Sequence, residues 1–203
     1  RARGAFHEID KVTEDSRVNG RMFFRYYDSY KGQCAAYELA RVFELDNVPP
    51  TACRRVDGVD GSVQLWMEDT SSERDQGGAG STPPVTIDWL RQLQTMRLFD
   101  SLIYNDDRNS GNYLVGIDWD LWMIDHSRAF QMRSDLRYDE EIVWCTRRMW
   151  QLLQQVTDDQ IRDAVDPYLV SRQLNALIER RSALVEHIQK MIDERGEDAV
   201  IRD

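Results

Sequence analysis

The sequence predicts an α+β fold in which a small strand-rich lobe comes first and a larger, mainly helical lobe follows. Residues 1–68 hold short apolar stretches separated by Gly, Asn and Pro, a pattern typical of strands and turns. Residues 69–84 contain almost no apolar side chain and are rich in Gly, Ser and Pro, which is typical of a flexible hinge or linker. In residues 85–203 apolar side chains recur at helical spacing. We therefore divide the chain at these boundaries.

Four elements are expected in the first lobe: a strand at residues 5–9, an aromatic strand at 22–27, a helix at 33–45 and a hairpin at 51–67. A polar, turn-rich link joins the two strands. The helix follows from the spacing of its apolar side chains between Cys34 and Phe43. It ends at Asn47 and Pro49, because proline removes a backbone donor and disfavours helical geometry in the preceding residue. Gly58 and Gly61 are expected to form the turn of the hairpin.

Four helices are expected in the second lobe, at residues 87–104, 146–156, 157–169 and 171–195. In the last of these Ser171 is the expected cap, and the helix ends before Gly196. Its apolar stripe predicts packing against the core rather than a cofactor site. Between the first two helices, apolar runs at 113–115 and 121–124 flank a turn and predict an antiparallel hairpin.

Charge and cysteine content exclude several classes of protein. The net charge is −10 and no long basic run is present, so a nucleic-acid partner is not expected. No apolar run approaches the ~20 residues that span a bilayer, so no transmembrane segment is expected. For the compartment there are two alternatives: the cytoplasm, which is the first expectation, and secretion after removal of a signal peptide. Three cysteines without CxxC spacing, Cys34, Cys53 and Cys145, predict buried thiols rather than a disulfide framework or a zinc site.

The segment from Tyr104 to Phe130 carries the residues suited to chemistry. If the expected hairpin is centred between Asp118 and Trp119, Asn112 lies directly opposite Asp125. Residues so placed have Cβ atoms about 5 Å apart, close enough for two side-chain oxygens to share one cation. A carboxylate with a carboxamide is a hard, oxygen-only ligand set that suits Mg²⁺ at a nucleotide site. Asn112 and Asp125 are therefore the candidate metal ligands.

Asp107 lies five residues before Asn112, on the loop that leads into the hairpin. A carboxylate there is placed to orient a hydroxyl nucleophile and to accept its proton, which makes Asp107 the candidate catalytic residue. The adjoining Arg108 and Asn109 have two alternative roles, either fixing this loop or contacting phosphate.

The pattern Asn105-x-Asp107-Arg108-Asn109-x-x-Asn112, followed by Ile124-Asp125-His126, resembles the catalytic and metal-binding loops of atypical kinases. The kinases with a similar pattern are type II phosphatidylinositol 4-kinases, HipA-like kinases and secretory-pathway kinases, together with uncharacterised bacterial kinase-like proteins. The resemblance implies a bilobal protein-kinase-like fold that uses ATP with Mg²⁺ or Mn²⁺. It also implies Asp107 as the catalytic aspartate, Asn112 and Asp125 as metal ligands, and a nucleotide-binding hinge that includes Glu68.

Two departures from the kinase pattern concern the phosphates. A strand lysine paired with a helix glutamate normally holds them, yet these positions fall on His7 and Gln33. Lys11 is a possible substitute, since in a continuous strand it would share a face with His7. No glycine-rich phosphate loop is present in the sequence. The expected function is therefore transfer of phosphate from ATP to a hydroxyl acceptor on a protein, lipid or small molecule. The alternatives are a pseudokinase that senses nucleotide or binds protein, and an AMP-transferring variant.

Overall fold

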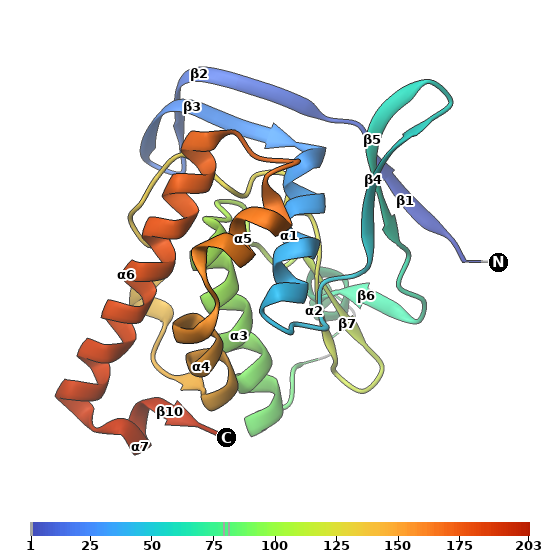
Figure 1. Ribbon diagram of the computed structural model, residues 1–203. Coiled ribbons are helices and arrows are strands. Elements are labelled where there is room, and N and C mark those ends of the chain that lie inside the picture. The colour runs from blue at the N-terminus through green and yellow to red at the C-terminus, as the bar shows by residue number, and fades with distance from the viewer. Residues whose placement is uncertain (1, 79, 81) are drawn as a thin grey trace.

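The structure is a computed structural model that describes residues 2–78, 80 and 82–203. In chain order the elements are β1 (Gly4–His7), β2 (Asp10–Val18), β3 (Arg21–Ser29), α1 (Tyr30–Val42), β4 (Thr51–Val56), β5 (Val59–Leu65), β6 (Thr70–Ser72), α2 (Glu73–Gly78), α3 (Ile87–Ile103), β7 (Tyr113–Gly116), β8 (Leu121–Met123), a 3-10 turn (Asp139–Glu141), β9 (Cys145–Thr146), α4 (Arg147–Gln155), α5 (Asp158–Val165), α6 (Ser171–Arg195), α7 (Glu197–Val200) and β10 (Ile201–Arg202). In Figure 1, β1, β4 and β5 lie on the side of the molecule that carries the N-terminus, β2 and β3 run above the helices, and helices make up most of the remainder.

The strand-rich region contains two separate antiparallel units. One is a three-stranded sheet in the order β1-β5-β4, in which the expected hairpin of β4 and β5 turns at Gly58. The other is the β2–β3 hairpin, which lies over the helical region in Figure 1. The expectation of a turn-rich link over residues 10–18 was wrong. Because almost every side chain of β2 is exposed, its sequence has no apolar alternation to reveal the strand.

A third sheet, β6-β7-β8, stands beside the helices. Its first strand and the short helix α2 lie within residues 69–84, where the sequence predicts a linker. Residues 79 and 81 of that range lie outside the described residues. β6 is held by three backbone pairs to β7, Thr70 to Ser72 against Gly116 to Leu114, and α2 buries none of its side chains. Backbone pairing rather than apolar burial therefore orders residues 70–78.

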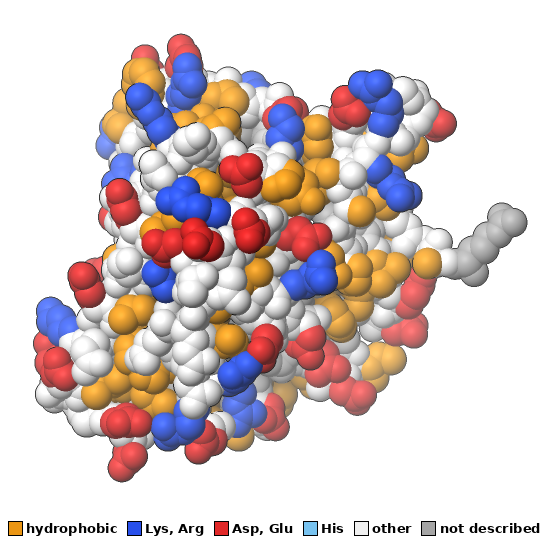
Figure 2. Space-filling view, in the orientation of Figure 1, with side chains coloured by type: hydrophobic (Ala, Val, Ile, Leu, Met, Phe, Trp, Pro, Cys, Tyr) orange, Lys and Arg blue, Asp and Glu red, His pale blue; other side chains and the backbone are white. Residues whose placement is uncertain are grey.

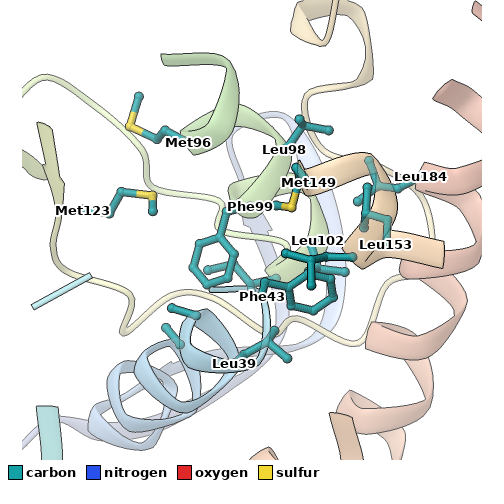
Figure 3. Packing of buried hydrophobic residues seen from close by; sticks show 14 of the residues in the cluster. Leu39, Phe43, Met96, Leu98, Phe99, Leu102, Met123, Met149, Leu153 and Leu184 are labelled. Carbon is teal, nitrogen blue, oxygen red and sulfur yellow. The ribbon is translucent and has the colours of Figure 1, made fainter. Parts of the chain in front are cut away.

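The main core lies in the helical region, where α1, α3, α4 and α6 meet (Figure 3). Leu39 and Phe43 of α1 pack with Phe99 and Leu102 of α3, and each of these four side chains is at most 1% exposed. The α+β class, with a small strand-rich region and a helical region, is as predicted. The N-cap of α6 differs from the predicted Ser171. It is Val170, which donates its N–H to the Gln173 side chain at 3.1 Å.

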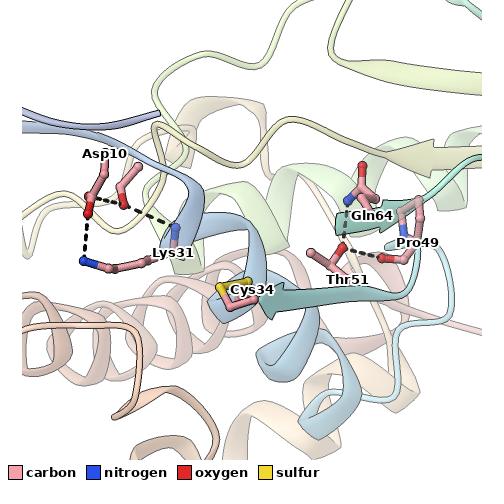
Figure 4. Close-up of a disulfide and its surroundings, with 8 residues drawn as sticks. Asp10, Lys31, Cys34, Pro49, Thr51 and Gln64 are labelled. Carbon is pink, nitrogen blue, oxygen red and sulfur yellow. Dashed lines mark hydrogen bonds and ion pairs between the residues drawn. A yellow bond between two sulfur atoms is a disulfide. The ribbon is translucent and has the colours of Figure 1, made fainter. Parts of the chain in front are cut away.

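Helix α1 is joined covalently to the β1-β5-β4 sheet by a disulfide between Cys34 and Cys53 (Figure 4). The expectation of buried free thiols was wrong for this pair. α1 packs across β4, and this brings the two Cα atoms to 5.9 Å, within the range that a disulfide spans. The expectation holds for Cys145, which is free and fully buried, and burial raises the pKa of its thiol to about 12.

Loss of this disulfide should lower stability measurably. The bridge closes a loop across a sequence separation of 19, for which chain entropy predicts a contribution of about 3 kcal/mol to the free energy of unfolding. We expect Cys34→Ala/Cys53→Ser to unfold at a lower urea concentration than the wild type, as followed by circular dichroism. A reducing agent should shift the wild type to the midpoint of the double variant and leave the variant itself unchanged. Equal midpoints for both proteins without reductant would contradict the prediction.

Charged side chains of both signs are interspersed over the face shown in Figure 2. Among the helices of the described residues, none is both long and apolar enough to cross a bilayer.

Candidate functional site

The loop after α3 begins with a sharp turn that the sequence encodes locally. Tyr104 adopts a left-handed backbone with φ of 48° and caps the helix. Asn105 is fully buried, and its amide donates to the Asp100 carboxylate at 2.9 Å. The side-chain oxygen of Asn105 then accepts the N–H of Asp107 at 3.3 Å. Asn105 therefore fixes the direction in which the chain leaves the helix.

Two further amides hold the backbone at Asp107. The side chains of Asn109 and Asn112 both donate to the Asp107 carbonyl, at 3.0 and 2.8 Å. Asn112 also reaches the Asp107 carboxylate at 3.3 Å. This carboxylate is 29% exposed, so it is fixed from behind while one side stays open to solvent. The structure thus brings together Asp107 and Asn112, and the Asn109 side chain makes hydrogen bonds within the loop; its contact with phosphate stays a prediction.

The β7–β8 hairpin forms where the sequence predicts it, with a register that differs by one residue. Tyr113 pairs with Met123, so Asn112 stands opposite Ile124, whose N–H donates to the Asn112 carbonyl at 3.3 Å. The predicted pairing of Asn112 with Asp125 was wrong. The connection is a three-residue loop closed by left-handed Trp119 with φ of 65°, and an odd loop shifts the centre of the hairpin.

Asp125 directly follows Ile124, so it remains beside Asn112 at the end of the hairpin. Its φ of 55° is left-handed and ends the strand pairing. One carboxylate oxygen accepts from the Ser127 hydroxyl at 3.2 Å. The side-chain nitrogen of Asn112 points toward Asp107, so the side-chain oxygen of Asn112 points away from Asp107. The available donors are hard oxygens, and this chemistry fits Mg²⁺ or Mn²⁺.

Clusters of three or more His, Cys, Asp or Glu side chains with metal-site geometry are absent from the part of the chain that the structure describes. A divalent ion held by Asn112 and Asp125 would therefore complete its coordination with water and substrate oxygens, as Mg²⁺ commonly does.

Arg108 is buried at the centre of these loops. Its guanidinium makes a two-pronged ion pair with Asp100, at 2.8 and 2.9 Å, and the two side chains are 1% and 0% exposed. It also donates to the carbonyl of Ile124 at 2.9 Å and to the carbonyl of Asn112. Of its two expected roles, fixing the loop fits this geometry. The side chain is enclosed, and its donors are directed to Asp100, Asn112, Ile124 and His126; a phosphate contact by Arg108 stays a prediction.

His126 is also enclosed, beneath Asp125. Its Nε2 accepts from Arg108 at 3.1 Å, so the ring proton is on Nδ1, which is buried and has no partner among the described residues. Burial, followed by the nearby Arg108 cation, lowers the pKa of His126 well below its usual 6.5. The imidazole is therefore neutral in the folded protein and supports the loop through Arg108.

This neutral histidine predicts an acid-sensitive fold. The unfolded chain takes up a proton at His126 as pH falls below about 6.5, whereas the folded chain does not, so protonation favours unfolding. His126 alone should lower the free energy of unfolding by about 1.4 kcal/mol per pH unit below that point, until the folded-state pKa is reached. Urea titrations at several pH values should give a shallower dependence for His126→Gln. Identical dependence in both proteins would contradict the prediction.

Helix α1 starts directly on the loop that follows Asp125. The Ser29 N–H donates to the Ser127 carbonyl at 2.8 Å. At Gly32 a side-chain Cβ would come within 2.6 Å of the His126 carbonyl oxygen, so only glycine permits this approach. The helix and the loop that follows Asp125 are therefore in direct backbone contact.

A pocket of about 340 Å³ opens between the strand-rich region and the β6-β7-β8 sheet. It is lined mainly by apolar or small side chains, namely Ala5, Gln64, Leu65, Trp66, Met67, Thr70, Ser71, Ser72, Asp75, Leu114 and Ile124. Leu114 and Ile124 connect it to the hairpin that carries Asn112 and Asp125. Glu68 stands just outside this lining and pairs with Arg3 at 2.9 Å, both side chains being exposed.

The three residues expected near phosphate are placed differently from one another. His7 lies two residues after Ala5 on β1, so by strand alternation it faces the same side as this pocket residue. Gln33 is 2% exposed on α1, and its Nε2 has no hydrogen-bond partner within the described residues. Lys11 does not share a strand with His7, because β1 ends at His7 and Lys11 belongs to β2. The continuous strand on which the substitution of Lys11 depended is therefore absent, and a phosphate contact by Lys11 stays a prediction.

The β2–β3 hairpin contributes residues that sequence reasoning missed. Asp28 accepts from Arg128 Nε at 3.1 Å, and Arg128 Nη1 donates to the Asp107 carboxylate at 3.0 Å. At the turn of the hairpin, the Asn19 amide donates to the Asp106 carbonyl at 2.8 Å. No local pattern marks these residues, since Asp28 and Arg128 are separated by 100 positions; the arginine three residues after Asp125 was the only available signal.

No family model and no curated protein sequence matches the chain. Several solved structures match in fold. A hydra Fam20 solved with sugar has a TM-score of 0.69 and 14% identity, covering 99% of this chain and 81% of its own. A Golgi casein kinase with Mn/ADP bound has a TM-score of 0.63 and 18% identity, covering 98% and 70%. The Helicobacter pylori proinflammatory kinase CtkA has a TM-score of 0.54 and 10% identity, covering 94% and 97%. The chain therefore has an atypical kinase-like fold.

Proposed function

We propose that the chain is an ATP-dependent phosphotransferase that holds MgATP or MnATP between its strand-rich and helical regions and passes phosphate to a hydroxyl acceptor. The observation that carries this proposal is the grouping of Asp107, Asn112 and Asp125. The Asn112 amide bonds to Asp107, and the Asn112 carbonyl accepts from the residue before Asp125. Asp107 is thus held beside Asn112, and Asp125 follows the residue that pairs with Asn112, on the kinase-like fold that the comparisons support.

Each residue of this group has a distinct role. Asp107 orients the acceptor hydroxyl and takes up its proton as the oxygen bonds to phosphorus. Asn112 and Asp125 would hold the divalent ion. When bound, such an ion neutralises negative charge on the phosphate oxygens. Asn105 and Asn109 keep the Asp107 loop in place, and Arg108 ties it to the Asp125 loop.

The pocket beside Trp66 and Met67 suits the adenine base. It has about 340 Å³, is largely apolar, and ends at Ile124, one residue from Asp125. A flat aromatic ring placed there would have its phosphates directed toward the ion site. The Golgi casein kinase structure has Mn/ADP bound, which supports the proposal of a nucleotide with a divalent metal for this chain.

A pseudokinase is the second candidate, and Gln33 favours it. A neutral carboxamide stands where the glutamate of the ion pair is expected, and its buried Nε2 has no partner among the described residues. His7 in place of the lysine points the same way. Transfer of AMP remains the variant reaction, and its products distinguish it, since it releases pyrophosphate whereas phosphate transfer releases ADP.

The disulfide bears on the compartment. Disulfides form and persist in oxidising environments, so Cys34–Cys53 favours the secretory alternative over the cytoplasm. The acceptor class stays a hydroxyl on a protein, lipid or small molecule. The sugar in the hydra Fam20 structure adds carbohydrate hydroxyls to the compounds worth testing.

Calorimetric titration of ATP tests the proposal. Binding to the wild type should require Mg²⁺ or Mn²⁺, disappear with EDTA, and fall sharply in Asp125→Ala. The matched control is Asp118→Ala, an exposed aspartate at the tip of the same hairpin, which should bind as the wild type does. Absence of metal-dependent binding in the wild type would overturn the nucleotide site. Binding without turnover against a panel of acceptors would favour the pseudokinase.

A further inference from the structure

Arg128 lies between the candidate catalytic residue and the β2–β3 hairpin. Its Nη1 donates to the Asp107 carboxylate at 3.0 Å, and its Nε donates to Asp28 at 3.1 Å. The side chain is 42% exposed, in contrast to Arg108, which is 1% exposed. One guanidinium therefore bridges two carboxylates and stays free to turn toward solvent.

The site is poor in other cations that a phosphate could use. Not one of the eleven residues lining the pocket is a lysine or arginine. His7 and Gln33 occupy the expected ion-pair positions, and Arg108 is enclosed. Arg74 donates to the Asn109 side chain at 2.8 Å and makes no hydrogen bond or ion pair with Asp107 among the described residues. Arg128 is consequently the partly exposed arginine that directly touches Asp107.

Phosphoryl transfer fixes where the reacting group must be. The acceptor oxygen is held by Asp107, and the transferred phosphoryl lies in line between that oxygen and the leaving oxygen of ADP. A guanidinium 3.0 Å from Asp107 is therefore within reach of the equatorial phosphoryl oxygens. Negative charge on those oxygens is what an arginine stabilises in such a transition state.

We propose that Arg128 acts, within its own chain, as the arginine that stabilises the transferring phosphoryl group in place of the missing strand lysine; this rests on the proposed function. The oxygen–phosphorus bond to the acceptor forms and the bond to ADP breaks. The electron pair leaves with ADP, and the acceptor's proton passes to Asp107. Arg128 exchanges its carboxylate partners for phosphoryl oxygens and takes no proton.

The β2–β3 hairpin carries a lysine that can take the place of Arg128 beside Asp28. Asp28 has one carboxylate oxygen buried without a partner among the described residues, and the other bound to Arg128. Lys11 stands directly opposite Asp28 in the β2–β3 ladder and makes no ion pair with any residue that the structure describes. Directly opposed side chains are close enough to pair, so Lys11 can neutralise Asp28 when Arg128 turns away.

The test separates ground-state binding from transition-state binding. We would titrate ADP and Mg²⁺, with and without aluminium fluoride, into the wild type, Arg128→Ala and Arg128→Lys. Wild type should bind ADP much more tightly with aluminium fluoride, which mimics the transferring group. Arg128→Ala should lose that gain yet bind Mg·ADP within about threefold of the wild type, and its kcat should fall by about 10³ or more with little change in the KM for ATP. Arg128→Lys should recover part of both.

The control is Arg25→Ala, an exposed arginine on β3 paired with Glu14, which should match the wild type in every titration. Retention of the aluminium fluoride gain and of kcat in Arg128→Ala would overturn the assignment of Arg128 alone. Absence of metal-dependent ADP binding in the wild type would overturn the proposed function with it. Melting temperatures verify that each variant is folded, and Arg128→Lys provides the decisive comparison if the alanine variant is not.

Discussion

Asp125→Asn should lower phosphotransfer by two or more orders of magnitude. The substitution keeps the size of the side chain and removes the one formal negative charge among the two candidate metal ligands. Groups that stabilise developing charge in a closed site commonly contribute factors of about 10²–10³ each. The measurement is initial-rate ADP production at a Mg²⁺ concentration that just saturates the wild type, with any acceptor found to be active. Extra Mn²⁺ should restore part of the activity, because the defect is in metal affinity.

Asp118→Asn is the matched control, since it makes the same chemical change on an exposed residue of the same hairpin. Its rate should stay within about twofold of the wild type, as surface substitutions away from the site usually do. Near-normal turnover in Asp125→Asn, or an equal loss in both variants, would contradict the assignment of the metal site.

Arg108→Met should destabilise the fold by about 3–5 kcal/mol, because removal of one partner leaves the buried Asp100 charge uncompensated. Asp100 is fully buried, and apart from Arg108 its carboxylate accepts only from the Asn105 amide among the described residues. The variant also frees the carbonyls of Ile124 and Asn112. Urea unfolding followed by tryptophan fluorescence measures the change.

Arg55→Met tests whether burial is the cause. Arg55 makes an equally well-formed two-pronged pair with Asp60, at 2.9 and 2.8 Å, on the exposed β4–β5 hairpin. Water screens that pair, so its loss should lower the free energy of unfolding far less than loss of the buried pair does. The double variant Arg108→Met/Asp100→Leu should recover part of the lost stability, because no lone charge remains. Equal costs for Arg108→Met and Arg55→Met would show that burial is unimportant here.

The local elements of the fold were largely predictable from the sequence. Helical periodicity gave α3 and α6, and glycine-containing turns gave the β4–β5 and β7–β8 hairpins. β2 was missed because the period-2 signal needs one buried face, and this strand lies exposed. The disulfide was missed for a different reason. The spacing of Cys34 and Cys53 carries no information until α1 is known to pack across β4.

The candidate site was predictable where it is local and unpredictable where it is not. Asp107 and Asn112 lie on one short loop, so their proximity follows from the sequence. The register of the hairpin depended on one left-handed residue, Trp119, which is an unusual conformation for tryptophan. The role of Arg108 was uncertain from the sequence, because it depends on whether the side chain is buried. Asp28 approaches the site only through the placement of a hairpin 100 positions away from Arg128.

Kinases are often switched by swinging the helix that corresponds to α1 toward or away from the phosphates. In this chain that helix is fastened at two points, by the sulfur bridge to β4 and by the bare glycine face at Gly32 against the His126 carbonyl. A swing would have to break a covalent bond or lose a backbone contact. Under the proposed function we therefore expect activity that is set by how much of the protein is made and oxidised, and not by repositioning of α1.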